Sequence, residues 1–310
     1  MRHLLLPIIF SFCITNIVIA QNQFNLTQNM MHQPFINDAS MGSYNKINGA
    51  FIFRNQWIGL DGAPKTFALN FNSPIQFNSK SHIGFTVLSD EIGVRENIDI
   101  SLSYGYRMQI SKSGNLVLSL SPTLRLLQAD FQKVETDIDA DPTFLTNTGT
   151  ERALNFRFGS YYFAERYYIG FSAPNLLSNS FSITNESVDT EFDFKDIHFY
   201  LHGGYSFKLD NNYDLNTSSI IKQVSASPTQ IDFNVQIEYL KKVSVGLVYR
   251  TSKEVAGLFS FNIKQALRLA YAYDYSFGQL NEVSSGTHEV MIIFTPQSNK
   301  DIPLISAPRF

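Results

Sequence analysis

Residues 98–110 read Ile-Asp-Ile-Ser-Leu-Ser-Tyr-Gly-Tyr-Arg-Met-Gln-Ile, an uninterrupted alternation of apolar residues with polar or small ones. Because successive side chains of a β-strand point to opposite faces, this stretch predicts a strand with one apolar and one polar face. At about 3.3 Å per residue the strand spans about 40 Å. Globular strands usually have about 5–6 residues, whereas a tilted strand that crosses a bilayer has about 9–11. The length therefore favours a membrane-crossing strand.

The same period of two recurs along most of the chain, and no segment shows a period of 3.6 over three helical turns. The predicted strands fall at 50–57, 67–71, 83–87, 98–110, 116–126, 154–158, 166–172, 197–207, 214–222, 231–239, 243–249, 259–263, 267–273 and 290–294. We expect an all-β protein, a transmembrane outer-membrane β-barrel of about 14 antiparallel strands. A secreted β-sandwich is the soluble alternative, but such strands are too long for it.

The connections alternate between short polar turns and longer links. The short turns are 111–114, 165–166, 210–212, 241–242 and 264–265, and the longer links are 129–152, 174–192, 222–228 and 275–286. Outer-membrane barrels have short periplasmic turns and longer external loops. We therefore expect the links 129–152, 174–192 and 275–286 outside the cell.

Composition agrees with this class and excludes others. The 310 residues include 16% charged, 44% hydrophobic and 14% aromatic residues, with a net charge of −3. A disordered chain has more charge and fewer rings, and the acidic balance offers no field that attracts nucleic acid. The mean hydropathy is −0.09 because lipid-facing and lumen-facing residues cancel. Outer-membrane lipid is thus the expected surroundings of the barrel.

The first 20 residues have the pattern of a secretory signal peptide. Arg2 precedes an apolar stretch that ends in Val18-Ile19-Ala20, so we expect cleavage near Ala20. A retained membrane anchor is the alternative. Cys13 lies in this leader and is the chain's one cysteine, so the mature chain offers no thiol for a disulfide or a metal. The expected organisation is a signal peptide at 1–20, a periplasmic arm at 21–48, the barrel at 49–295 and a periplasmic tail at 296–310.

Candidates for chemistry are few, and we expect no enzyme, no cofactor and no resident metal. His198 and His202 share the inward face of a predicted strand, but a third metal ligand is not evident, and hydrogen bonding in the lumen is the alternative. Asp137, Asp139 and Asp141 form an acidic run that lacks the Gly and Glu of an EF-hand. A loose Ca²⁺ site and a solvated acidic loop both remain open there.

Several short motifs resemble the PorP/SprF family of the type IX secretion system, found in outer membranes of Bacteroidota. They are spread over the mature chain and comprise Thr27-Gln28, Arg54-Asn55-Gln56-Trp57, Asp61-Gly62 with Pro64, Pro174-Asn175, Asp274 and His288-Glu289. Taken as residues, Asp61, Gly62 and Pro64 form a turn, Arg54 faces the lumen or a plug, and Trp57 suits a membrane interface with its N–H toward water. A docking surface for another protein is the other interpretation of these motifs. The chain departs from the family's Asn-Pro-Ala at Asn37-Asp38-Ala39.

The resemblance implies a non-catalytic component of type IX protein secretion. Its partners would be other secretion subunits, namely the periplasmic ring and the peptidoglycan-anchored proteins. A SprF-like member would instead serve one secreted adhesin, often in gliding motility, through the adhesin's C-terminal sorting domain. The alternative from another class is a passive porin or hydrophobic-compound transporter.

Overall fold

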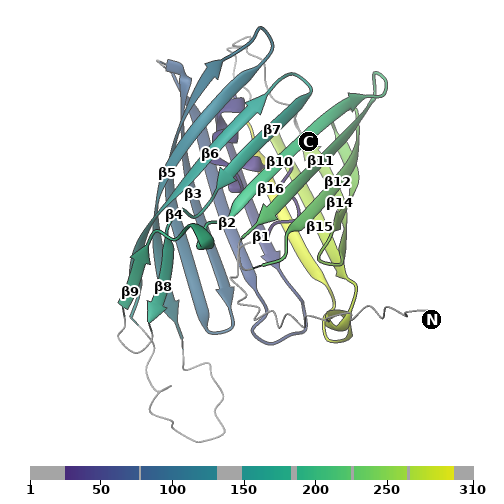
Figure 1. Cartoon of the computed structure of the whole chain (residues 1–310). Coiled ribbons are helices and arrows are strands. Elements are labelled where there is room, and N and C mark those ends of the chain that lie inside the picture. The colour runs from purple at the N-terminus through teal and green to yellow at the C-terminus, as the bar shows by residue number, and fades with distance from the viewer. Residues whose placement is uncertain are drawn as a thin grey trace, which may run out of the picture.

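The computed structural model describes residues 25–76, 78–130, 149–182, 187–224, 227–263 and 266–296. Within them, 14 strands close into an antiparallel barrel in which chain neighbours are also sheet neighbours (Figure 1). The strands of the barrel are β1 (Asn48–Asn55), β2 (Lys65–Ile75), β3 (Asn78–Ile92), β4 (Arg95–Gln109), β5 (Asn115–Ala129), β6 (Glu151–Phe163), β7 (Tyr167–Ala173), β10 (Phe199–Lys208), β11 (Tyr213–Gln223), β12 (Gln230–Tyr239), β13 (Val243–Arg250), β14 (Glu254–Ile263), β15 (Leu267–Ser276) and β16 (Thr287–Phe294). The predicted number of strands and their antiparallel pairing are confirmed.

Burial follows the period of two, as the sequence predicted. In β4, Ser101 is 1% exposed and Leu102 is 62% exposed. The outward residues form the apolar band that faces lipid, and the inward residues are polar or small. No helix among the described residues is long and apolar enough to cross a membrane.

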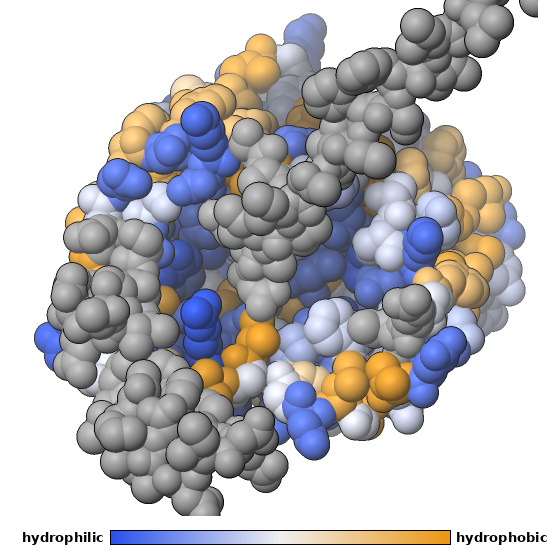
Figure 2. Space-filling model, turned by 60° about the horizontal axis from the view of Figure 1, so that its bottom comes forward, coloured by the Kyte–Doolittle hydropathy of each residue, from blue (hydrophilic) through white to orange (hydrophobic). Residues whose placement is uncertain are grey.

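The two ends of the barrel differ in their connections. At the end where β1 begins, short turns join β2 to β3, β4 to β5, β6 to β7, β10 to β11, β12 to β13 and β14 to β15. The opposite end carries the links 56–64, 130–150, 174–198, 224–229 and 277–286, together with the tight turns 93–94 and 251–253. We call these the short-turn end and the long-link end. Figure 2 brings the long-link end forward, with hydrophilic residues inside the mouth and hydrophobic ones around its outer side.

The link between β7 and β10 has structure of its own. It contains the two-stranded sheet of β8 (Ser178–Ser182) and β9 (Ser187–Glu191), followed by the 3₁₀ helix η5 (Phe194–Asp196). Another 3₁₀ helix, η7 (Gln279–Glu282), lies in the link between β15 and β16. The acidic run 137–141 lies outside the described residues.

The segment 25–47 lies inside the barrel rather than in an arm beside it. It contains the 3₁₀ helices η1 (Gln33–Phe35) and η2 (Asp38–Ser43), which Figure 1 shows in purple within the wall. Asn25 contacts Lys222 near the long-link end, and Asn45 contacts Arg107 near the short-turn end. The segment thus runs through the lumen, and we call it the plug. The sequence analysis expected a periplasmic arm at 21–48, whereas the structure places residues 25–47 of that range inside the barrel.

The plug is as buried as the core of a globular domain. Leu26, Met41 and Ala39 are 2%, 1% and 0% exposed. The physical reason for its position is that a wide barrel leaves a lumen that side chains from the wall alone do not fill. The plug supplies that filling and gives inward polar groups their hydrogen-bond partners.

Candidate functional site

The barrel closes where β1 meets β16, the first and last strands of the chain. Arg54 on β1 and Glu289 on β16 are directly opposite in the register of this seam. Both side chains point into the lumen and are almost fully buried, and Arg54 Nη1 donates to Glu289 Oε2 at 3.0 Å. The prediction that Arg54 faces the lumen or a plug is therefore met.

The plug binds to both residues of this pair, mainly to Glu289. The backbone N–H groups of Thr27 and Gln28 donate to the two carboxylate oxygens of Glu289, at 2.9 and 2.8 Å. The Gln28 side-chain amide donates to the backbone oxygen of Glu289 at 3.1 Å. Glu289 therefore holds two successive peptide groups of the plug while it pairs with Arg54.

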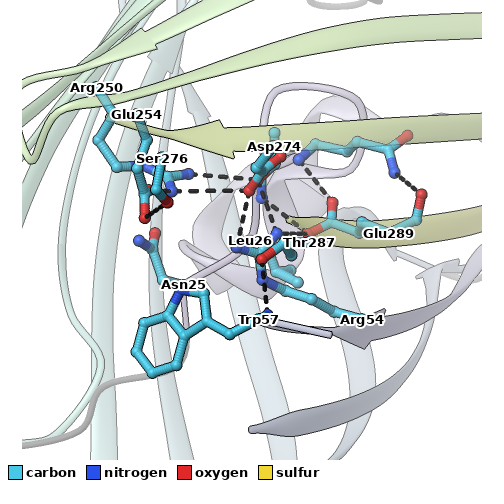
Figure 3. A network of polar contacts seen from close by, with 12 residues as sticks. Asn25, Leu26, Arg54, Trp57, Arg250, Glu254, Asp274, Ser276, Thr287 and Glu289 are labelled. Carbon is cyan, nitrogen blue, oxygen red and sulfur yellow. Dashed lines mark hydrogen bonds and ion pairs between the residues drawn. The ribbon is translucent and has the colours of Figure 1, made fainter. Parts of the chain in front are cut away.

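Asp274 on β15 completes the arrangement. Its Oδ2 accepts from Thr27 Oγ1 at 2.6 Å and from Arg54 Nη2 at 2.8 Å, while Arg54 Nη1 also donates to Thr27 Oγ1 at 2.8 Å (Figure 3). Five residues from four separate motifs thus meet at one place. We call Thr27, Gln28, Arg54, Asp274 and Glu289 the seam network.

Residues that the sequence analysis did not single out extend this network. Arg250 on β13 donates to Thr27 Oγ1 at 3.3 Å and lies 3.8 Å from Asp274 Oδ2. It also pairs with Glu254 and with Asp232, and Asp232 pairs in turn with Lys222 at 2.9 Å. The sequence signal that could have identified these residues is a charged residue on the inward side of an alternating strand. Such a charge points into the lumen and needs an opposite charge beside it.

With these additional residues, the charged cluster around the seam network contains three cations and four carboxylates in a space that excludes most water. The cations are Arg54, Lys222 and Arg250, and the carboxylates are Asp232, Glu254, Asp274 and Glu289. Each buried charge carries a large desolvation cost, which its partners must offset. Removal of one partner therefore costs more than the pair contributes, and the set specifies where the plug sits.

A second anchor holds the middle of the plug to the opposite wall. Asp38 pairs with Arg157 on β6 at 2.9 Å and accepts from Ser121 on β5 at 2.7 Å. Asn37 Nδ2 donates to the Ser160 backbone oxygen and lies 3.0 Å from His202 Nε2. The position at which the chain departs from the family's Asn-Pro-Ala is therefore a buried charge that faces the wall, and His202 takes part in lumenal hydrogen bonding.

The other motif residues lie outside the seam network. Asn55 and His288 sit on the outward side of the seam, where His288 Nδ1 is 2.6 Å from the hydroxyl of Tyr271. Asn175 Oδ1, just after Pro174, accepts from Arg125 Nη2 at 2.9 Å, and Arg125 also pairs with Asp99. These contacts belong to a different part of the wall.

The link between β1 and β2 is a turn, as its residues indicate. The N–H of Gln56 donates to the backbone oxygen of Pro64 at 2.9 Å and closes the link at its base. Gly62, after the exposed Asp61, has a φ of +70°, which favours glycine. A Cβ at Gly62 would also lie 3.1 Å from the Cα of Gly93 in the neighbouring turn.

Trp57 differs from the expectation of an indole with its N–H in water. Its backbone N–H donates to Thr287 Oγ1 at 3.1 Å, which fixes the residue beside the seam. The indole Nε1 is buried, without a hydrogen-bond partner among the described residues. Figure 3 shows the ring beside Asn25, at the edge of the seam network.

The arrangement is suited to holding a peptide segment in place. Most of its donors and acceptors bind one another and the plug backbone, while Arg54 Nε and Asp274 Oδ1 have no hydrogen-bond partner among the described residues. Within the described residues, no group of three or more His, Cys, Asp or Glu side chains is placed to hold a metal ion.

Solved structures of other proteins share the fold of this chain. In solved structures the same fold occurs in the CymD monoaromatic hydrocarbon channel, with a TM-score of 0.53 and 10% identity over 89% of this chain and 95% of that one. The toluene transporter TbuX of Ralstonia pickettii has a TM-score of 0.51 and 8% identity over 85% and 92% of the two chains. At such identities the likeness concerns the fold alone, and it defines the chain as a β-barrel of the outer-membrane class.

The family follows from the sequence. The model of the family "Type IX secretion system membrane protein PorP/SprF" matches residues 18–294, so the chain belongs to this family. No curated protein matches the chain. The resemblance carried by the dispersed motifs is thereby confirmed.

Proposed function

We propose that this chain is a non-catalytic outer-membrane component of type IX protein secretion that works through its ends and its outer surface. Membership of the PorP/SprF family supports the secretion role. The plug supports a role for the ends and the outer surface, because residues 26–43 are all buried inside the barrel. A barrel filled in this way supports docking of other subunits better than passage of solutes.

The passive porin or hydrophobic-compound transporter is the rival function. Its support is the likeness to CymD and TbuX, which concerns the fold alone. Against it stands the anchoring of the plug on opposite walls, at Glu289 and at Arg157. A solute that passed through the lumen would have to break buried ion pairs, and breaking such pairs is costly.

Orientation is part of the proposal. Short turns of outer-membrane barrels face the periplasm, so the short-turn end is the one that would meet the periplasmic ring and the peptidoglycan-anchored subunits. The long-link end would then face outward, where a SprF-like member would meet the sorting domain of its adhesin. Thr295, the residue after β16, lies at the short-turn end, which would direct the tail at 296–310 to the periplasm.

The test combines a deletion with affinity purification. A strain that lacks the chain should lose secretion of one or more cargo proteins and regain it with the wild-type gene. A tag in the turn at Asp210–Asn212, which is exposed at the short-turn end, should be compared with the same tag in the Thr251–Lys253 turn at the other end. Recovery of secretion subunits with the Thr251–Lys253 tag, and poorer recovery with the Asp210–Asn212 tag, supports docking at the short-turn end. Normal secretion in the deletion strain, with no subunit recovered by either tag, contradicts the proposal.

A further inference from the structure

The link that leads into β10 exposes two large aromatic side chains. Phe192 is 67% exposed and Phe194 is 68% exposed, more than any other large apolar side chain in the described chain. Both lie in the short stretch that joins β9 to β10, and Phe194 begins η5. A soluble surface would leave these rings in water, which is unfavourable for so much apolar area.

These rings continue the lipid-facing side of the wall. The Phe194 ring centroid lies 5.4 Å from that of Phe199, and Phe199 stacks on Phe171 at 5.9 Å. Phe199 and Phe171 belong to the outward set of β10 and β7, because their neighbours Tyr200 and Ser172 are buried in the lumen. An unbroken series of rings therefore leads from the lipid-facing wall onto the link.

The barrel wall is shorter at β7 than at the neighbouring β6. β7 ends at Ala173, opposite Phe158 of β6, so the part of β6 from Glu151 to Arg157 extends beyond it toward the long-link end. Figure 1 shows η5 beside the lower end of β10, next to this step in the wall. The link thus lies where the apolar outer surface of β7 and β10 ends.

Polar contacts fix the link in this position. Asp193 accepts the N–H of Lys195 at 2.9 Å and caps η5. Asp196 accepts from Ser178 at 2.7 Å and thereby ties η5 to the start of β8. Aromatic rings beside charged groups are the composition found at membrane interfaces, where the rings enter the apolar region and the charges remain in water.

We propose that Phe192 and Phe194 insert into the interfacial layer of the bilayer and hold the β8–β9 hairpin against the membrane surface. The occupant of this apolar surface is lipid, because the surface is continuous with the lipid-facing wall through Phe199 and Phe171. The hairpin itself is held along β6, where Asn179 binds the Asn155 side chain and the Leu154 backbone oxygen, and the Ser178–Asp196 contact joins it to the anchored rings.

The experiment places single spin labels in the full chain in phosphatidylcholine vesicles. Cys13, the one cysteine of the sequence, is replaced by serine in every variant, so an introduced cysteine is labelled alone. Phe192→Cys and Phe194→Cys are compared with Phe171→Cys in the lipid-facing wall and with Asp210→Cys in an exposed turn. Collisions of the label with oxygen, which dissolves in lipid, and with a water-soluble nickel chelate report its depth. Heat-modifiable electrophoretic mobility confirms that each variant is folded.

The proposal expects the ratio of oxygen to nickel collisions at Phe192→Cys and Phe194→Cys to exceed that at Asp210→Cys several-fold and to stay below that at Phe171→Cys. A ratio equal to that of Asp210→Cys in vesicles overturns it. If the labels are aqueous in vesicles and shielded only in native outer membranes, the occupant is a protein and the lipid proposal is wrong.

Discussion

Arg54 and Glu289 face each other across the seam that closes the barrel, and the Glu289 carboxylate also binds the N–H groups of Thr27 and Gln28. The plug is therefore bound at the strand pair with the greatest sequence separation in the wall, β1 with β16. Such a contact carries the largest loop-closure cost. Docking of the plug and closure of the seam stabilise each other.

Thr27→Val removes the hydroxyl that bonds Asp274 and Arg54 and leaves those buried groups short of a partner. A buried polar group without its partner costs about 1–3 kcal/mol. Amide hydrogen exchange of β1 and β16 should accelerate, measured by mass spectrometry in vesicles. The matched control is Thr123→Val, which removes a buried hydroxyl that bonds Ser101 at 2.7 Å on the far wall. Equal acceleration at the seam in both variants would contradict the coupling.

Arg157→Met leaves Asp38 buried without its cation. Breaking a buried ion pair from one side costs about 3–5 kcal/mol, so the free energy of unfolding in urea should fall by about that amount. Asp38→Asn in the same chain should restore most of the loss. Arg268→Met, which breaks the lumenal pair with Glu238 away from the plug, is the matched control for plug mobility. If a spin label on the plug gains mobility in neither Arg157→Met nor Arg268→Met, the second anchor has been misassigned.

His32 gives the plug a pH dependence. Burial lowers the pKa of His32 to about 4, and the hydrogen bond with Asn70 opposes this only in part. The unfolded chain, with a pKa near 6.5, therefore binds more protons than the folded one as the pH falls. The contribution of neutral His32 is complete above about pH 6.5 and is lost toward pH 4, with a slope of at most about 1.4 kcal/mol per pH unit. Unfolding of His32→Gln should show a shallower slope over this window, and an unchanged slope would contradict the assignment.

Cysteine labelling on intact cells tests the orientation. Glu282→Cys lies at the long-link end and Lys241→Cys at the short-turn end, and both positions are exposed. A membrane-impermeant maleimide should label Glu282→Cys in whole cells and Lys241→Cys only after the outer membrane is broken. The reverse pattern would show that the long links face the periplasm.

The wall was predictable because its signal is local. Ser101 and Leu102 already show which side of β4 faces the lumen, and the same alternation predicts the other strands. The plug was not predictable in this way. Leu26, Met30 and Phe35 have no regular period, and the lumen that buries them is built by strands distant in sequence.

The sequence predicted which residues belong to the candidate site, but not that they lie together. The motifs pointed to Thr27, Arg54 and Glu289 separately, yet their meeting depends on the register of the closing seam, which pairs Arg54 with Glu289. Arg250 belongs to no motif that we singled out, and its role follows from its contacts with Thr27 and Asp274 in the folded barrel.

Conductance tests most directly the claim that the chain's own plug fills the lumen. The purified full chain is inserted into planar lipid bilayers, and the current is recorded under applied voltage beside a double variant, Thr27→Ala with Arg157→Ala, that weakens both anchors. The account predicts no steady current from the wild-type chain and intermittent openings from the variant. A steady, porin-like current from the wild-type chain would contradict it.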